Sequence, residues 1–377
     1  MWKFLPYVLK NLIGHRARTV MTIGGTALLM FLFLFIASIQ EGLNRLLESS
    51  DERLIVFQAY RFCPSSSQLP LYYEEAIRSV PGVKEVLPIK IVVNNCRASL
   101  DTVVFNGVPP KVLPQMRSGI RFLSGDWSAF QGRTDAAIVG RRIAERRGLS
   151  PGQSFTVAGV SVHVAGVFAT EASGEENVIY THLPMLVHAA HGSDLHVTEY
   201  EVTIADPRQA EAIAAAIDAK IKDRFDIHTE TKPQKAHYRN ALADLIDLIG
   251  LTRWLGIVCM GVVVVLVANS VIMAAQDRVK EHAVLQTLGF SGSRIVALML
   301  TESCLISFTG GLLGTVACVA WLMWQPLSLS TEGVSIDFVA SPRLIVWGLG
   351  LSAGIGLVAG IVPAIQAGRA EIVASFR

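Results

Sequence analysis

The sequence has few charged residues and almost no net charge. Only 17% of its 377 residues are Asp, Glu, Lys or Arg, and the formal net charge is +2. Proteins that bind nucleic acid usually carry a clear basic excess, so this balance predicts no nucleic-acid partner. With 51% hydrophobic residues as well, the sequence is too apolar for an ordinary soluble protein. This composition predicts membrane spans together with a water-facing domain.

Motifs for binding nucleotides or metals are missing as well. The sequence contains no Gly-x-x-x-x-Gly-Lys-Ser/Thr phosphate loop and no His-Glu-x-x-His metal motif. We therefore expect no ATP hydrolysis by this chain, no catalytic residue, and no cofactor or metal of its own. His188, His191 and His196 are close in sequence, but Gly192-Ser193 between them favours a loop over a zinc site.

Cysteines are also few. Cys259, Cys304 and Cys318 lie in apolar stretches, whereas Cys63 and Cys96 lie in the polar middle of the chain, and no Cys-x-x-Cys pair occurs. If that middle region is outside the cytoplasm, a disulfide between Cys63 and Cys96 is chemically allowed. Whether their Cα atoms come close enough to bond is left open by the sequence.

Long uncharged runs are what the sequence does contain. A membrane helix needs about 20 consecutive apolar residues, because each residue rises 1.5 Å through a core about 30 Å thick. Four runs satisfy this requirement: 19–40, 254–276, 303–331 and 344–368. The first is longer than the apolar part of a signal peptide and is predicted to be an uncleaved span. The third is expected to leave the membrane near Trp324.

The basic residues near these runs predict one orientation, because Lys and Arg are retained on the cytoplasmic side. Residues 1–18 carry basic residues and no acidic ones, and the segment between the second and third runs and the chain end are also basic. Both termini are therefore expected in the cytoplasm, with the region between the first two runs outside it. The basic residues concerned are Lys3, Lys10, Arg16, Arg18, Arg278, Lys280, Arg294, Arg369 and Arg377.

The region of about 200 residues between the first two runs is large enough for its own core. β-branched, partly alternating segments predict strands, and stripes of apolar residues predict helices. The strands are expected at 84–93, 102–108, 136–139, 154–168 and 199–204, and the helices at 72–80 and 207–224. The residues from Lys235 to Thr252 predict a continuous helical stalk leading into the second span.

The expected fold is an α-helical membrane protein with four transmembrane helices and an α+β extracytoplasmic domain inserted between the first and second. The divisions are a cytoplasmic N-terminal helix (1–18), first span (19–41), α+β domain with stalk (42–240), stalk and second span (241–276), cytoplasmic helix (277–293), third span (294–325), short outer loop (326–342), fourth span (343–368) and cytoplasmic tail (369–377).

Three polar features of the spans each have two interpretations. The segment from Asp277 to Ser291 has strong helix formers and ends at Gly289, which fits either a short helix that binds a partner or a solvated interfacial hairpin. Glu302 fits either a functional intramembrane charge or a structural partner of Arg294 or Arg278. Asn269 fits either a hydrogen bond across a dimer interface or a cap for a neighbouring backbone.

Several motifs in the correct order resemble those of the MacB/FtsX-like ABC permease family. They are Asn11-Leu12 with Arg16-x-Arg18-Thr19, Val104-Phe105-Asn106-Gly107-Val108, Ala137-Ile138-Val139-Gly140, Arg278-x-x-Glu281 with Leu285-Gln286-Thr287-Leu288-Gly289, Gly310-Gly311-x-x-Gly314, and Gly360-x-x-Pro363-Ala364. Each motif is weak alone, but together they cover nearly the whole chain.

This resemblance implies a permease in the bacterial inner membrane with a MacB-like periplasmic core domain. Its implied partners are a separate ABC ATPase that binds ATP, a second copy or close paralogue in the membrane, the lipid itself and a periplasmic membrane-fusion adaptor. The implied ATPase-coupling residues are Arg278, Glu281, Leu285, Leu288 and Gly289. Two functions follow: export or extraction of a substrate from the outer face of the membrane, or FtsX-like signalling to a cell-wall hydrolase.

Overall fold

The protein divides into two compact units in the computed structural model. The structure describes residues 16–48, 53–61, 66–94, 102–170, 174–190, 196–279, 284, 286–287, 290–325, 327–331 and 334–368. The helical unit comprises Met1–Glu41, Leu248–Gln325 and Val339–Arg377, and the sheet unit comprises Gly42–Asp247 and Pro326–Phe338. The two units are built from different elements and are described separately.

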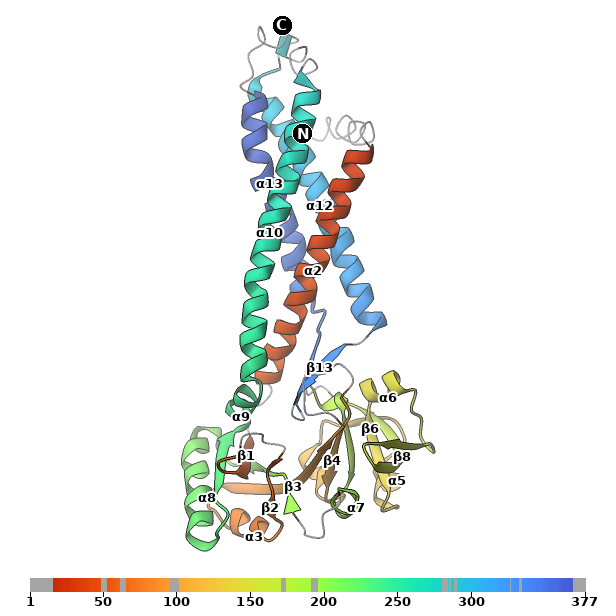
Figure 1. The fold of residues 1–377 in the computed structure, drawn as a ribbon, viewed down its shortest axis with the longest axis vertical. Coiled ribbons are helices and arrows are strands. Elements are labelled where there is room, and N and C mark those ends of the chain that lie inside the picture. The colour runs from red at the N-terminus through yellow and green to blue at the C-terminus, as the bar shows by residue number, and fades with distance from the viewer. Residues whose placement is uncertain are drawn as a thin grey trace. The chain divides into compact units, whose positions relative to one another are not determined.

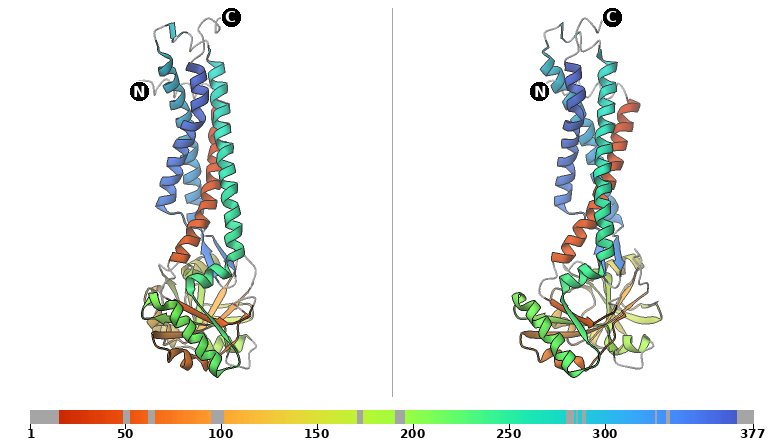
Figure 2. Two further views of the ribbon diagram at one scale, coloured as in Figure 1. Left: turned by 90° about the vertical axis from the view of Figure 1, so that its left-hand side faces the viewer. Right: turned by 60° about the vertical axis from the view of Figure 1, so that its left-hand side comes forward.

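The helical unit consists of long apolar helices that lie side by side (Figures 1 and 2). They are α2 (Arg16–Glu48), α10 (Ala243–Asp277), α12 (Gly292–Trp324) and α13 (Pro342–Gly368). Among the described residues, these four helices are long and apolar enough to cross a membrane. The start of α13 is fixed by Pro342, whose φ is suited to a first turn, and by the Ser341 hydroxyl, which accepts a bond from the Leu344 amide at 3.3 Å.

Small residues allow these helices to approach closely. A Cβ added at Gly310 of α12 would lie 2.7 Å from the Thr26 Cβ of α2, and one added at Gly314 would overlap the Ala27 carbonyl. At these two positions the absence of a side chain lets α12 approach the backbone of α2 closely. A Cβ added at Gly350 or Gly354 of α13 would have no neighbouring atom within 4 Å in the described residues, so these two glycines make no such close contact there.

Hydroxyl groups add hydrogen bonds between the helices. Ser303 of α12 donates to the Gly356 carbonyl of α13 at 2.6 Å, and Ser307 donates to the Ser352 carbonyl at 2.7 Å. All three serines are buried. Such bonds are worth about 0.6–2 kcal/mol each in a bilayer, so they set the register of α12 against α13 more than they determine stability.

The sheet unit is built on one mixed sheet. Its described strands have the order β12-β1-β11-β3-β4-β9-β6-β8-β5, and β7 pairs with β8. Pairing is antiparallel except between β4 and β9 and between β6 and β8. The strands are β1 (Arg53–Gln58), β3 (Val83–Val93), β4 (Val104–Val108), β5 (Arg121–Ser124), β6 (Ala136–Gly140), β7 (Ser154–Val157), β8 (Val160–Ala169), β9 (Val178–His182), β11 (Glu199–Ile204) and β12 (Thr229–Pro233), with a separate pair β2 (Leu69–Pro70) and β10 (His196–Val197).

Short helices cover this sheet and complete its cores. Apolar residues of α3 and α8 pack against β1, β3 and β11, and a second part of the core lies around β4, β6, β8 and β9. In Figure 1, α3 and α8 lie in the left-hand part of the sheet unit, together with β1 and β2. The helices are α3 (Tyr73–Arg78), α4 (Leu113–Met116), α5 (Trp127–Gln131), α6 (Arg141–Arg147), η3 (Glu175–Asn177), α7 (Leu183–Ala189), η4 (Pro207–Gln209), α8 (Ala210–Arg224) and α9 (Gln234–Ala241).

The segments predicted as β3, β4, β6, β11, α3 and α8 lie where the sequence pattern places them, whereas 154–168 forms two strands, β7 and β8. The pattern did not predict β1, β5, β9 or β12, or the helices from α4 to α7. The stalk is different, because the helix from Lys235 onwards is not continuous: α9 ends at Ala241 and α10 begins at Ala243. Leu242 between them is wholly buried, and its amide still donates to the Tyr238 carbonyl at 2.9 Å. Leu242 has φ −103° and ψ 9°, which differ from α-helical values, so the two helices are separate although the hydrogen bonds continue across this residue.

A second difference concerns residues 326–342, which the sequence predicts to be a short loop. They contain two antiparallel strands, β13 (Ser328–Thr331) and β14 (Val334–Asp337), which pair from Ser328 opposite Asp337 to Thr331 opposite Val334. This hairpin belongs to the sheet unit, although the chain on both sides of it belongs to the helical unit.

Candidate functional site

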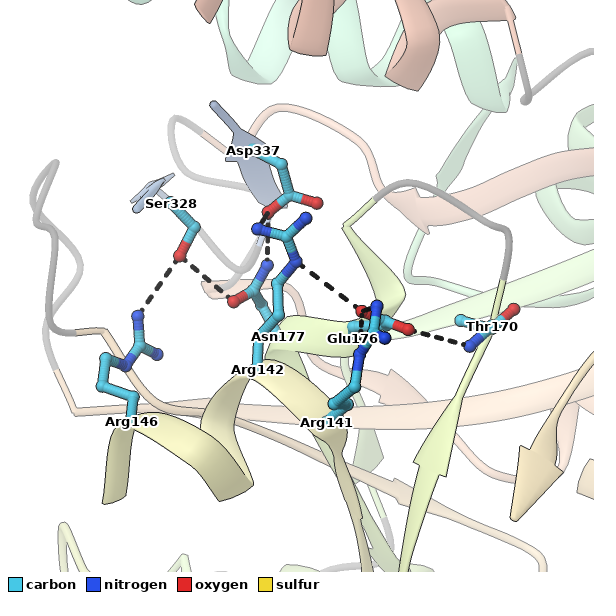
Figure 3. Close-up of polar contacts among 8 residues, drawn as sticks. All are labelled: Arg141, Arg142, Arg146, Thr170, Glu176, Asn177, Ser328 and Asp337. Atoms are coloured by element: carbon cyan, nitrogen blue, oxygen red, sulfur yellow. Dashed lines mark hydrogen bonds and ion pairs between the residues drawn. The ribbon is translucent and has the colours of Figure 1, made fainter. Parts of the chain in front are cut away.

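The β13–β14 hairpin is held in the sheet unit by a buried polar network (Figure 3). The side-chain amide of Asn177, at the end of η3, donates to Asp337 Oδ1 of β14 at 2.7 Å. The Ser328 hydroxyl of β13 donates to Asn177 Oδ1 at 3.1 Å. Asn177 therefore binds both strands of the hairpin with one side chain. Asn177 and Ser328 are each 1% exposed, so these bonds form away from water and are costly to leave unmade.

Arginines of α6 complete this network from the other side. Arg142 Nη1 lies 3.6 Å from Asp337 Oδ1, and its Nε lies 3.6 Å from Glu176 Oε2. Arg146 Nη1 donates to the Ser328 hydroxyl at 3.2 Å. One turn of helix separates the two arginines, so both reach the hairpin from the same helix face. We call Arg142, Arg146, Asn177, Ser328 and Asp337 the hairpin clamp.

Asp337 is the charged centre of the hairpin clamp. Burial raises the pKa of its carboxyl, while Arg142 and the Asn177 amide act in the opposite direction. The backbone is tightly fitted here too, since a Cβ at Gly42 would overlap the Asp337 carbonyl. Gly42 lies in the part of α2 that belongs to the sheet unit. The hairpin is thus fixed by side chains from α6 and η3 and by close contact with α2.

A second ionic cluster joins residues of the neighbouring strands β1 and β11 to Arg117. Arg117 makes a bidentate contact with Glu201 of β11, at 2.7 and 2.6 Å, and its Nε lies 3.0 Å from Glu175 Oε1. Arg53 Nη1 also reaches Glu201, at 3.0 Å. Burial alone would raise the pKa of Glu201, but the two arginines hold it at about 2. This carboxylate is therefore ionised throughout the physiological range.

Next to this cluster, Glu199 and His237 form a contact between neutral groups. Their Oε2 and Nε2 atoms are 3.9 Å apart. Burial and the nearby Glu201 raise the pKa of Glu199 to about 8, and burial lowers the pKa of His237 to about 4. At pH 7 the carboxyl is thus protonated and the imidazole uncharged, so no ion pair forms.

The helical unit has a buried ion pair of its own near the end of α10. Arg278 Nη1 lies 3.0 Å from Glu302 Oε2 of α12, and the two residues are 5% and 3% exposed. Arg18 of α2 reaches Asp277 at 2.7 Å. Of the two interpretations of Glu302, the structure has the ion pair with Arg278. Arg278 is therefore directed into its own protomer and not towards a free surface.

The other predicted coupling residues cannot be placed. Glu281, Leu285, Leu288 and Gly289 lie outside the described residues, and so do both members of the candidate disulfide, Cys63 and Cys96. The ATPase contact and the disulfide stay predictions.

Asn269 can be placed, on an exposed face of α10. The same face carries exposed apolar residues at intervals of three and four, the spacing of one side of a helix. They are Trp254, Val258, Val262, Val265 and Met273.

Sequence strings typical of catalysis occur in contexts that do not suit it. Gly-x-Ser-x-Gly, the pattern of a nucleophile elbow, occurs at 148–152 and at 350–354. An elbow places the serine on a sharp turn between a strand and a helix. Ser150 instead lies between α6 and β7, and Ser352 lies within α13. Of the histidines discussed above, His191 lies outside the described residues, within which no group of three or more His, Cys, Asp or Glu could hold a metal ion.

The clamp and the ionic cluster had no distinct signal in the sequence. Arg117 and Glu201 are 84 residues apart, and Asn177 and Asp337 are 160 apart. Each is an ordinary charged or polar residue in a segment of mixed composition. Only the acidic character of the segment holding Asp337 stands out, and it does not identify the partner of Asp337.

Comparison with protein families gives two matches. Residues 19–220 match the family described as MacB-like periplasmic core domain, and residues 254–372 match the family described as FtsX-like permease C-terminal. A comparison with curated protein sequences found no match. The first family covers more than half of the chain, and the second lies after it in the order expected of a permease.

Solved structures were also compared. The extracellular domain of the noncanonic ABC-type transporter YknZ from Gram-positive bacteria is 16% identical with a TM-score of 0.36, covering 48% of this chain and 99% of that one. The periplasmic region of MacB from Actinobacillus actinomycetemcomitans is 11% identical with a TM-score of 0.39, covering 51% and 92%.

The family matches agree with the span-capable helices and the mixed α/β unit, and they identify a multi-pass membrane protein. Proteins of this kind are generally non-catalytic subunits that work with an ABC ATPase. The chain belongs to the MacB/FtsX-like ABC permease family.

Proposed function

We propose that the chain is the permease subunit of an ABC transporter whose separate ATPase drives conformational change outside the cytoplasm, for export or extraction of a substrate from the outer face of the bacterial inner membrane. In this proposal α2, α10, α12 and α13 are the membrane spans and both termini are cytoplasmic. The sheet unit is the extracytoplasmic domain inserted between the first and second spans. The ATPase binds the nucleotide, and this chain needs no cofactor.

The observation that carries the proposal is how the sheet unit is connected. The backbone passes between the two units at four places, after residues 41, 247, 325 and 338. A movement of any of the four helices is therefore delivered to the sheet unit by a covalent connection. The hairpin clamp holds the β13–β14 hairpin, which connects α12 to α13, against α6 and η3. Because packed elements move as units, a displacement of this hairpin would also displace α6 and η3.

The proposed contact with the ATPase lies in the segment 277–293. Glu281, Leu285, Leu288 and Gly289 are proposed to contact the ATPase directly. Arg278 has a different proposed part: its ion pair with Glu302 and the neighbouring Arg18–Asp277 pair fix the base of this segment to α12 and α2. Because the start of the segment is held in this way, a force applied to the segment by the ATPase would be passed to α12 and α2.

A second copy of the chain, or a close paralogue, is proposed to pack against the exposed stripe of α10. Asn269 interrupts this apolar stripe. An amide facing lipid lacks a hydrogen-bond partner, whereas an amide at a helix–helix interface can bond across it. This supports the dimer interpretation of Asn269. A periplasmic adaptor remains a proposed partner from the family resemblance.

The first test is purification of the tagged permease together with its ATPase. Glu281→Lys and Leu285→Asp should each reduce the recovered ATPase at least about tenfold, since a buried interface tolerates neither a reversed nor a new charge. Glu211→Lys, an exposed change of the same sign in α8, is the matched control. Full ATPase recovery with both segment variants would refute the proposed contact.

The second test separates ATPase binding from transmission. Asn177→Leu removes the bonds to both hairpin strands while leaving the segment 277–293 unchanged. ATPase binding and hydrolysis should persist, but the ATP-dependent change in hydrogen exchange of β9 and β14 should be lost. Asn240→Leu, at an exposed position of α9, should leave that change intact. An unaltered response in Asn177→Leu would mean that the clamp transmits nothing.

Signalling to a cell-wall hydrolase is the other function open to this architecture. The match to a MacB-like core over residues 19–220 supports transport. Neighbouring genes for an ATPase and a membrane-fusion adaptor would agree with transport, whereas an adjacent hydrolase gene would favour signalling.

A further inference from the structure

The sheet unit contains a cavity of about 660 Å³ next to the Arg117–Glu201 cluster. Its wall comes from the start of β1, the chain from the end of α4 to the start of β5, the first residue of α6, the end of β8, and η3. A volume of this size is in the range of pockets that hold small ligands. All of these segments belong to the sheet unit.

Basic side chains dominate the charged part of this wall. It contains four arginines, Arg53, Arg117, Arg121 and Arg141, against two acidic residues, Glu175 and Glu176. The carboxylates are already engaged: Glu175 accepts from Arg117, and Glu176 accepts from Arg141 at 2.8 Å and from the Thr170 amide at 3.1 Å. Figure 3 shows Arg141 and Thr170 on the same carboxylate. A walled space with this excess of guanidinium groups attracts anions.

The arginines differ in what they can offer a ligand. Arg117 is fully occupied by Glu201, Glu175 and Tyr180. Arg121 makes no hydrogen bond or ion pair with any residue that the structure describes. Arg141 uses Nε and Nη2 for Glu176, which leaves Nη1 for another acceptor.

Backbone donors and apolar groups complete the wall. The amides of Ser118 and Gly119, between Arg117 and Arg121, donate to no backbone or side-chain acceptor in the described chain. Met116, Ile120 and Ala169 supply apolar surface in the same cavity. Free guanidinium and amide donors suit phosphate oxygens, which accept several N–H bonds at once.

We propose that this cavity binds a phosphate group, carried by a small amphiphile such as a lipid headgroup or present as a free anion, with Arg121 and the amides of Ser118 and Gly119 as its principal donors. Arg117, paired with Glu201 and Glu175, fixes the start of the segment that carries these donors. Met116, Ile120 and Ala169 receive the carbon atoms next to the phosphate. The site lies in the sheet unit and does not depend on the ATPase contact proposed above.

Calorimetric titration of the full chain in a nonionic detergent tests this proposal. The probes are dihexanoyl phosphatidic acid, inorganic phosphate, and dihexanoylglycerol as the phosphate-free comparison. Phosphatidic acid should bind with one site per chain. Arg121→Gln should weaken binding about tenfold, the cost of one charge-assisted hydrogen bond. Arg208→Gln removes the same charge at another exposed position of the sheet unit and should leave binding unchanged.

The probes also distinguish the sources of the phosphate. Binding of phosphatidic acid without binding of inorganic phosphate would assign the site to a lipid headgroup, and comparable binding of both would assign it to a free anion. Failure of both phosphate probes to bind the wild-type chain overturns the proposal. It is equally overturned if Arg121→Gln and Arg208→Gln bind alike, or if dihexanoylglycerol binds as tightly as phosphatidic acid.

Discussion

The two units satisfy their buried polar groups in opposite ways. In the sheet unit, arginines and carboxylates distant in sequence meet inside the domain, as in the Arg117–Glu201 pair and the hairpin clamp. In the helical unit the helix interfaces contain hydroxyls and glycines, as at Ser303 and Gly356, and the ion pairs Arg18–Asp277 and Arg278–Glu302 involve the last turn of α10 or the residue after it.

The difference follows from the solvent expected around each unit. A helix satisfies its own backbone, so helices in lipid need only close packing and a few hydroxyl bonds, and charges are expensive except near the interface. A water-facing sheet can draw charged side chains inward when each finds several partners. The four predictions below test this contrast, beginning with the largest expected effect.

The largest loss of stability is expected in the sheet unit, when one buried carboxylate is removed. Glu201→Ala leaves Arg117 and Arg53 without their shared partner, and breaking a buried pair in this way costs about 3–5 kcal/mol. Hydrogen exchange of the slowest amides in β1 and β11 would measure the loss. Glu211→Ala, exposed on α8, should change it by less than about 0.5 kcal/mol. Similar losses in the two variants would contradict a buried ionic core.

The ion pair of the helical unit should matter less. Glu302→Ala should cost about 2–3 kcal/mol, because Arg278 lies at a helix end from which a long side chain can reach the membrane interface. Unfolding in mixed detergent and SDS micelles would measure it. Adding Arg278→Met should recover part of the loss, since no unpaired charge is left. A double variant no more stable than Glu302→Ala would mean that the ion pair is not the reason for the loss.

The sheet unit should become less stable between pH 6.5 and pH 8. Glu199 keeps its proton up to about pH 8 in the folded state, but in the unfolded state it loses the proton at the ordinary glutamate pKa of 4.5. The folded state therefore binds more protons, and stability falls as pH rises through this window, by about 1.4 kcal/mol per unit at most and about 2 kcal/mol in total.

His237 sets the lower limit of this window. Its folded pKa of about 4 lies below the ordinary histidine pKa of 6.5, so its contribution makes stability rise with pH between these two values. Glu199→Gln should remove the decline above pH 6.5, as measured by hydrogen exchange of β11. A wild-type stability that is flat or rising from pH 6.5 to pH 8 would show that Glu199 is ionised.

The smallest effect is expected at Asn269. Asn269→Val should weaken self-association of the permease by about 0.6–1 kcal/mol, the usual value of one hydrogen bond between membrane helices. Energy transfer between labelled copies in liposomes at several protein-to-lipid ratios would measure it. Val265→Asn, one turn earlier on the same stripe, tests whether an amide affects self-association only at position 269. Tighter association of Asn269→Val would place the residue towards lipid instead.

The sequence predicted what depends on local pattern. Uncharged runs indicated the four span-capable helices, and β-branched segments indicated β3, β6 and β11, because periodicity and length are properties of neighbouring residues. The motif order also led to the family. In the sheet unit, however, the pattern could not give strand order, since β1 pairs with both β11 and β12, which lie far along the chain.

Most of the polar sites could not be predicted from the sequence, because their members are distant along the chain. The Arg278–Glu302 pair was one of the partners weighed for Glu302, because only 24 positions separate the two residues in the sequence. The hairpin clamp joins Asp337 to residues about 160 positions earlier, and the short segment that holds it has the composition of a surface loop. Burial of Leu242, where the stalk is interrupted, likewise depends on packing that the helical spacing does not contain.

The hairpin also determines where foreign sequence can be placed in this chain. Connections between membrane helices are usual positions for epitope tags, because surface loops accept added residues. Here such a tag within 328–337 would displace Ser328 or Asp337 from their buried bonds. The tight turn between β7 and β8, whose two residues Ala158 and Gly159 are both exposed, is the better position for a reporter of which side of the membrane the sheet unit occupies.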